Sequence, residues 1–173
     1  WQKEHHRIAS PVFICGESYG TIRAGKMMGL AENFPVKGVM LFSADLDVSL
    51  VAPVSGNEMP YVLSLPSMAA IAWYHNKTSH VNRTVQQAFD EAAAFANSDY
   101  LQALVQGRQL SEKQRGEVGA KLAALTGLPL QRVLDLNLRI NTDDFEMLLL
   151  AAEGKRIGKL DGQVAVPVPK ADK

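Results

Sequence analysis

The segment FICGESYGTIRAG, residues 13–25, contains the pattern Gly-x-Ser-x-Gly at Gly16, Ser18 and Gly20. An apolar, β-rich run precedes the pattern and a helix-like segment follows it. In a sharp strand-to-helix turn of this kind, small residues at 16 and 20 let the backbone cross closely and the serine hydroxyl projects outward. The backbone N–H of Tyr19, at the start of the helix, could then stabilise an oxyanion. This context favours Ser18 as a nucleophile over a serine in an ordinary glycine-rich turn.

A nucleophilic serine needs a base, and the chain has four histidines. His5 and His6 precede the predicted strand, which places them roughly 30–40 Å from Ser18 at about 3.3 Å per extended residue. That distance excludes both as the base, since hydrogen-bond reach is about 3 Å. His75 and His80 flank the end of a helix in the later part of the chain, where capping or surface roles are favoured over catalysis.

Asp45 and Asp47 follow the second predicted strand, at the sheet edge where the Ser18 turn also lies. One of them could orient a histidine, but a turn or helix-cap role is favoured. In folds with this turn the acid and the base follow the nucleophile in the order Ser, Asp, His. We therefore expect both to lie beyond residue 173, so that this chain alone is inactive.

The elements around the turn indicate a parallel sheet. Residues 11–15 and 36–44 are apolar strand-like runs, and residues 19–33 between them are helix-like. Nearly continuous apolar strands separated by a helix are typical of a βαβ unit buried on both faces. The sequence thus predicts an α/β fold.

The character of the chain becomes helical from about residue 53. Ser64 and Pro66 are expected to begin a helix over 65–75, and another is predicted over 84–107. Ser111 with Gln114 forms a capping box before a helix that ends at Gly127. Further helices are predicted over 129–140 and 143–154, the second capped by Asn141 or Thr142. The tail after residue 155 lacks periodicity.

These patterns predict three parts: a partial α/β core over 1–52, a helical insertion over 53–156, and a segment over 157–173 that returns toward core strands outside this chain. The chain begins with Trp1 and shows no signal peptide, so we interpret it as an internal fragment of a longer protein, which leaves localisation open.

Composition excludes several classes of function. The formal charge is zero and the basic residues do not cluster, which argues against nucleic-acid binding. No apolar run approaches the roughly 20 residues of a membrane span. A single cysteine, Cys15, excludes an internal disulfide framework and a cysteine-based metal cluster. We expect neither a metal nor a cofactor.

Five segments in one order resemble the bacterial branch of the serine carboxypeptidase family of α/β-hydrolases: SPVFICGESYGTIRAG, KGVMLFSADLD, PYVLSLPSMAAIAWYHNK, LTGLPLQRVLDLNLRI and IGKLDGQ. The resemblance covers nearly the whole chain, and the first and third segments are its most specific parts. It implies an α/β-hydrolase core whose helical cap lies over the active site.

The resemblance also implies a secreted or periplasmic exopeptidase that cleaves C-terminal residues from peptides through an acyl-enzyme. It assigns Ser18 as nucleophile, the Tyr19 amide as oxyanion donor, and Gly16 and Gly20 as structural residues of the turn. It implies that Glu17 binds the terminal carboxylate of the substrate. Two carboxyl groups in contact would share a proton, so peptide binding would weaken as pH rises. A buried acid bonded to nearby backbone amides is the alternative for Glu17.

Two other functions remain open at this point. An esterase or another acyl hydrolase could use the same turn, because nothing in the Gly-x-Ser-x-Gly pattern fixes the substrate. A non-catalytic interaction module is the alternative from another class: its helices would bind a partner and Ser18 would be vestigial. The oligomeric state is not predicted by the sequence.

Overall fold

In the computed structural model, the described residues are 1–30, 36–45, 47–78 and 83–168. They belong to two units, Trp1–Val48 and Ser49–Lys173. The fold is mixed helix and strand, and its parallel sheet has two strands. The α/β class predicted from the sequence is therefore present in the first unit.

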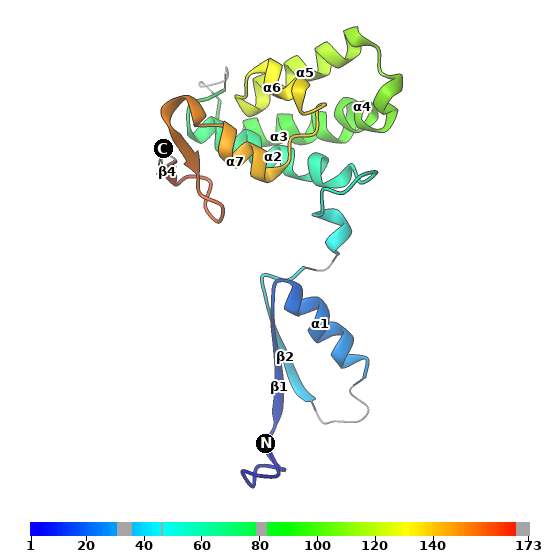
Figure 1. Cartoon of the computed structure of the whole chain (residues 1–173), viewed down its shortest axis with the longest axis vertical. Helices are drawn as coiled ribbons and strands as arrows, with labels where there is room; N and C mark the ends of the chain where they lie inside the picture. Colours follow the sequence, from blue (N-terminus) through cyan, green and yellow to red (C-terminus); the bar gives the residue numbers. More distant parts are fainter. Residues whose placement is uncertain (31–35, 46, 79–82, 169–173) are drawn as a thin grey trace, which may run out of the picture. The chain divides into compact units, whose positions relative to one another are not determined.

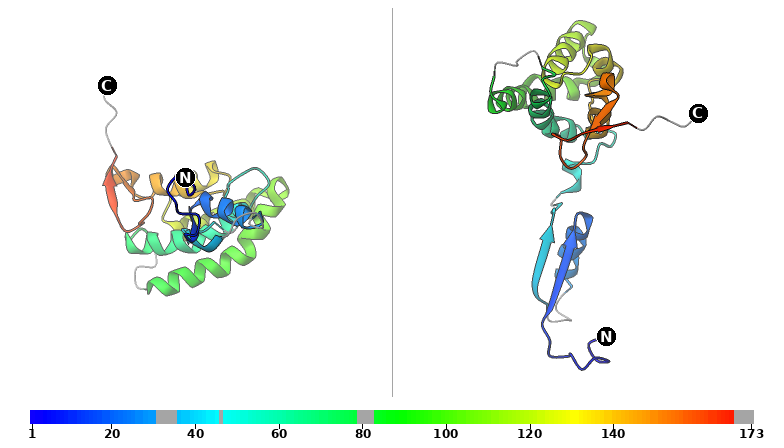
Figure 2. Two further views of the ribbon diagram at one scale, coloured as in Figure 1. Left: turned by 90° about the horizontal axis from the view of Figure 1, so that it is seen from below. Right: turned by 90° about the vertical axis from the view of Figure 1, so that its left-hand side faces the viewer.

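The first unit is a βαβ unit made of β1 (Val12–Glu17), α1 (Tyr19–Met28) and β2 (Val36–Phe42). The two strands pair in parallel, with Ile14 opposite Val39 and Glu17 opposite Phe42. Helix α1 runs alongside the strands (Figures 1 and 2). The predicted strand over 11–15 continues to residue 17, and the predicted helix over 19–33 ends at residue 28, while residues 31–33 lie outside the described part of the chain.

One face of this sheet packs against α1 and the other is exposed within the unit. Val12, Ile14 and Gly16 are half-buried or buried on the helix side. The opposite face presents Phe13 and Phe42, which are 57% and 55% exposed. Parallel sheets are normally covered on both faces, whereas in this unit only the face toward α1 is covered.

The second unit is helical, with a small hairpin (Figure 1). Its α-helices are α2 (Met59–Tyr74), α3 (Val85–Phe95), α4 (Leu101–Gln106), α5 (Glu112–Thr126), α6 (Leu130–Asp135) and α7 (Thr142–Leu148). The π-helical turn η3 (Ala96–Tyr100) joins α3 to α4, and the 3₁₀ turns are η2 (Val48–Leu50), η4 (Gly107–Gln109) and η5 (Ala151–Glu153). Strands β3 (Lys155–Ile157) and β4 (Ala165–Pro167) pair antiparallel.

The core of this unit is aliphatic, with two aromatic rings stacked at its centre. Phe95 and Tyr100 lie with their ring centroids 6.0 Å apart, and Tyr100 is 1% exposed. The Tyr100 hydroxyl donates a 2.6 Å hydrogen bond to the carbonyl of Leu138. That bond satisfies the buried phenol and fixes the turn between α6 and α7 to α4 and η3.

Local capping signals are confirmed. The Ser111 side chain accepts from the Gln114 amide and the reciprocal bond is also present, so the capping box forms. Helix α5 ends at Gly127, which is left-handed at φ 70°, and Asn141 caps α7. Each of these signals acts within one helical turn.

The predicted start of α2 is wrong. The helix begins at Met59, with Pro60 in its first turn, and Pro66 lies inside it. Pro60 has the φ that a first turn requires, and the Ser64 hydroxyl bonds back to the Pro60 carbonyl at 2.7 Å instead of capping. The burial of Pro66 in the core offsets the hydrogen bond that its missing N–H removes.

Four further predictions differ from the structure. The helix predicted over 84–107 contains the π turn η3, within which the Ser98 hydroxyl bonds to the Ala94 carbonyl. The helices predicted over 129–140 and 143–154 end earlier, at Asp135 and Leu148. The tail forms the β3–β4 hairpin, which periodicity did not predict because its strands have three residues each.

Candidate active site at the strand-to-helix turn

Ser18 is the single residue between β1 and α1. Its backbone has φ 50° and ψ −124°, a region that residues with side chains rarely occupy. Its amide donates to the Phe42 carbonyl at 3.0 Å, which extends the sheet pairing by one residue before the chain turns. Ser18 is exposed and its side chain makes no helix-capping bond. The hydroxyl is therefore presented at the tip of a strained turn.

Gly16 makes the turn possible. A Cβ at this position would lie 2.4 Å from the Gly20 carbonyl oxygen and 2.9 Å from the Thr21 nitrogen. Both are backbone atoms, so no side-chain rotation could relieve the clash. A Cβ on Gly20 would meet nothing within 4 Å. The close crossing thus requires glycine at 16, while position 20 tolerates a larger residue within this unit.

Thr21 supports the turn, and the sequence reasoning missed it. It is 4% exposed, and its hydroxyl donates to the Ser18 carbonyl at 2.7 Å while the Thr21 amide bonds to the same carbonyl at 2.9 Å. The hydroxyl also accepts from the Asp45 amide at 3.1 Å. Thr21 therefore ties the start of α1 to the segment after β2. A threonine three residues after Ser18 indicates the local bond, but no signal indicates the bond to residue 45.

Tyr19 and Glu17 lie on either side of Ser18. Tyr19 is the first residue of α1, and the first amides of a helix lack intrahelical acceptors. Its N–H is thus available near the serine hydroxyl, while its side chain is 63% exposed. Glu17 ends β1 and is also exposed, and no hydrogen bond or ion pair of its side chain is found among the described residues. The structure therefore places Glu17, Ser18 and Tyr19 together at one sheet edge.

The exclusion of His5 and His6 as the base agrees with the structure, because both lie before β1 and Ser18 follows it, at opposite ends of the strand. Asp45 is half-buried and contacts Thr21 through its backbone, and Asp47 is exposed. No histidine bonds to the Ser18 hydroxyl within the described ranges.

The other two histidines belong to the second unit. His75 is the C-terminal cap residue of α2, and its Nε2 lies 2.8 Å from the Gly162 carbonyl, which fastens the loop of the β3–β4 hairpin to α2. This is the structural role that the sequence favoured. His80 lies outside the described residues.

Among the residues that the structure describes, no group of three or more His, Cys, Asp or Glu side chains could hold a metal ion. None of the described helices is both long and apolar enough to cross a bilayer.

No family model, curated protein or solved structure matches the chain.

Proposed function

We propose that this chain is a segment of an α/β-hydrolase of the serine carboxypeptidase type, with Ser18 as the nucleophile. The observation that supports the proposal most is the backbone of Ser18, with φ 50° and ψ −124° between a parallel strand and a helix. A serine held there exposes its hydroxyl and has a helix amide next to it, which is the arrangement that acyl transfer uses. Gly16 and Thr21 hold the backbone of this turn in place.

In the proposed reaction the Ser18 oxygen attacks the last peptide carbonyl and a histidine takes the serine proton. The Tyr19 N–H stabilises the oxyanion, the histidine returns the proton to the leaving amine, and water releases the acyl group. The base and the acid that orients it are expected outside the 173 residues. Glu17 holds the terminal carboxylate of the peptide through a shared proton, so peptide binding weakens as that proton is lost at higher pH.

A serine-directed fluorophosphonate probe tests the nucleophile in the full-length protein. We expect stoichiometric labelling that Ser18→Ala abolishes. Ser43→Ala is the matched control, because Ser43 is exposed, belongs to the same unit and also has a positive φ of 47°. A folded protein that is not labelled would contradict the proposal and favour the non-catalytic interaction module. Labelling that survives Ser18→Ala would also contradict it, because the nucleophile would then be another residue.

An esterase with the same turn is the second candidate, because the Ser18 geometry alone does not select a substrate. Blocked dipeptides with free and with amidated C-termini separate the two functions. A carboxypeptidase cleaves only the free acid, and Glu17→Gln should raise KM for it while leaving fluorophosphonate labelling intact. Equal turnover of the acid and the amide would exclude the carboxypeptidase.

A further inference from the structure

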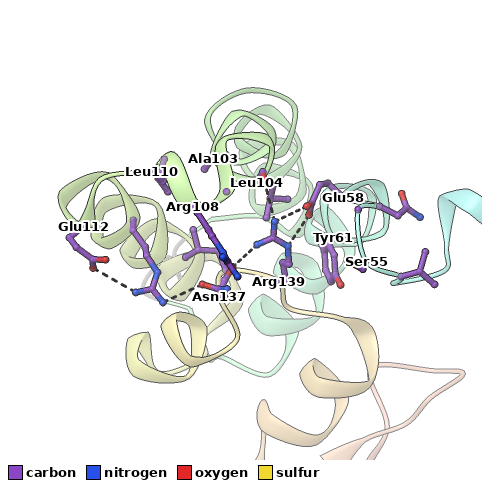
Figure 3. A pocket seen from close by; sticks show the side chains of 16 residues that line it. Ser55, Glu58, Tyr61, Ala103, Leu104, Arg108, Leu110, Glu112, Asn137 and Arg139 are labelled. Atoms are coloured by element: carbon purple, nitrogen blue, oxygen red, sulfur yellow. Dashed lines mark hydrogen bonds and ion pairs between the residues drawn. The ribbon is translucent and has the colours of Figure 1, made fainter.

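A cavity of about 610 Å³ lies within the helical unit, away from every residue assigned above. Its walls come from the loop before α2, the first turn of α2, α4, η4, the start of α5 and the turn between α6 and α7 (Figure 3). All of its lining residues lie between positions 54 and 139, so a single unit forms the whole cavity. Its volume is in the range of small-molecule sites.

Four residues that line this cavity have positive φ: the glycines Gly56 and Gly107, which adopt it without strain, and Asn137 and Leu138. Asn137 and Leu138 are consecutive, with φ of 57° and 67°. This backbone conformation costs free energy, so it persists only where surrounding contacts stabilise it. The hydroxyl of Tyr100 does so through its 2.6 Å bond to the Leu138 carbonyl. Such conformations cluster at ligand sites.

Five charged side chains face the cavity, and most are paired. Arg139 donates from Nε and Nη2 to the two carboxylate oxygens of Glu58, at 3.0 and 2.6 Å. Arg115 donates to the Leu134 carbonyl at 2.7 Å and lies 3.7 Å from Glu112, whose side chain is 90% exposed. The Arg139–Glu58 pair is therefore satisfied, whereas the exposed Glu112 neutralises Arg115 only weakly.

Arg108 is the fifth charged residue that faces the cavity. It follows Gly107 in η4, and no hydrogen bond or ion pair of its guanidinium is found in the part of the chain that the structure describes. Figure 3 shows its side chain pointing toward Asn137 and Arg139. Three arginines against two glutamates leave the cavity with one net positive charge. A guanidinium with all its donors free binds oxyanions in a bidentate manner.

The rest of the lining is mixed. Ser55, Asn57 and Asn137 are polar, whereas Leu110 and the ring of Tyr61 beside Glu58 are half-buried and offer apolar surface (Figure 3). A ligand of this volume can therefore combine an anionic group with a small apolar part. A monoanion matches the single net charge, whereas a dianionic phosphate would leave an excess negative charge beside Glu58 and Glu112.

We infer that this cavity binds a small organic carboxylate with an apolar part, whose carboxylate is held by Arg108. The apolar part lies against Leu110. This binding is independent of Ser18 and of the hydrolase proposed above.

Isothermal titration of the 173-residue chain tests the inference with 3-phenylpropanoate, its neutral amide and inorganic phosphate. We expect saturable binding of the carboxylate and at least about ten-fold weaker binding of the amide, since a charge-assisted hydrogen bond is lost. Arg108→Gln should weaken carboxylate binding by about ten-fold or more and leave the Tm unchanged, because Arg108 has no bond to lose. Arg132→Gln is the matched control: Arg132 is an exposed arginine on α6 that does not line the cavity.

Each of the other outcomes would overturn the inference. Equal affinity for the acid and its amide would show that the cavity does not recognise the charge. Unchanged affinity in Arg108→Gln, or the same loss in Arg132→Gln, would exclude Arg108 as the binding group. If inorganic phosphate binds more tightly than the carboxylate, the cavity selects a dianion and not a monocarboxylate. If the carboxylate does not bind at millimolar concentration, the cavity is not a carboxylate site.

Discussion

Replacing Gly16 with alanine tests whether the close backbone crossing holds Ser18 in place. The new Cβ would lie 2.4 Å from the Gly20 oxygen, and ordinary contact begins at 3.4 Å, so the strand and the helix must separate by about 1 Å. Overpacking of this kind costs about 1–3 kcal/mol. A displacement of about 1 Å at a catalytic group costs about 100-fold in rate. We therefore expect the rate of fluorophosphonate labelling at Ser18 to fall by about two orders of magnitude.

Gly20→Ala is the matched control, because the same methyl group there meets nothing within 4 Å. It lies in the first turn of α1, where alanine is a better helix former than glycine by about 0.5–1 kcal/mol. Labelling rates are measured on the full-length protein, and circular dichroism shows that each variant is folded. A folded Gly16→Ala protein that labels at the wild-type rate would refute the reasoning, and so would an equal loss in Gly20→Ala.

Three other predictions concern single side chains. Thr21→Val keeps the shape but leaves the amide of residue 45 unsatisfied, so we expect a loss of about 1–3 kcal/mol in unfolding free energy and slower labelling; unchanged values would contradict the role of its hydroxyl. Burial raises the pKa of Tyr100, so above about pH 10 the unfolded state binds fewer protons than the folded state and stability falls as pH rises. A Tm series from pH 8 to 11 should show this fall in wild type and a smaller one in Tyr100→Phe. Gly127→Ala should lower the Tm by several degrees, because its φ is 70° and its Cβ would lie 2.6 Å from the backbone of Lys77, whereas Gly116→Ala in the same helix should not.

Local patterns predicted the parts of this structure that depend on neighbouring residues. The turn at Ser18 depends on Gly16, two residues before it. The capping box at Ser111 and the left-handed cap at Gly127 follow from bonds within one helical turn. In each case the residue type and the backbone group it serves are adjacent in the chain.

Contacts between distant residues could not be predicted in this way. Thr21 bonds to a residue 24 positions away, and the Tyr100 hydroxyl supports a turn 38 positions away. The left-handed pair at Asn137 and Leu138 depends on that distant bond, so the sequence offers no local reason for it. The cavity around Arg108 was also not predicted, because its walls come from three stretches of the chain, 54–61, 103–115 and 137–139, that only the fold brings together.

The most direct measurement of the central claim is the mass of the acyl-enzyme. The full-length protein is mixed with a p-nitrophenyl ester of a blocked amino acid, quenched in acid during turnover, digested with trypsin and analysed by tandem mass spectrometry. We expect an acyl group on the tryptic peptide 8–23, with fragment ions that assign it to Ser18 and not to Ser10. An acyl group on any other residue, or turnover with no acyl group on this peptide, would contradict it.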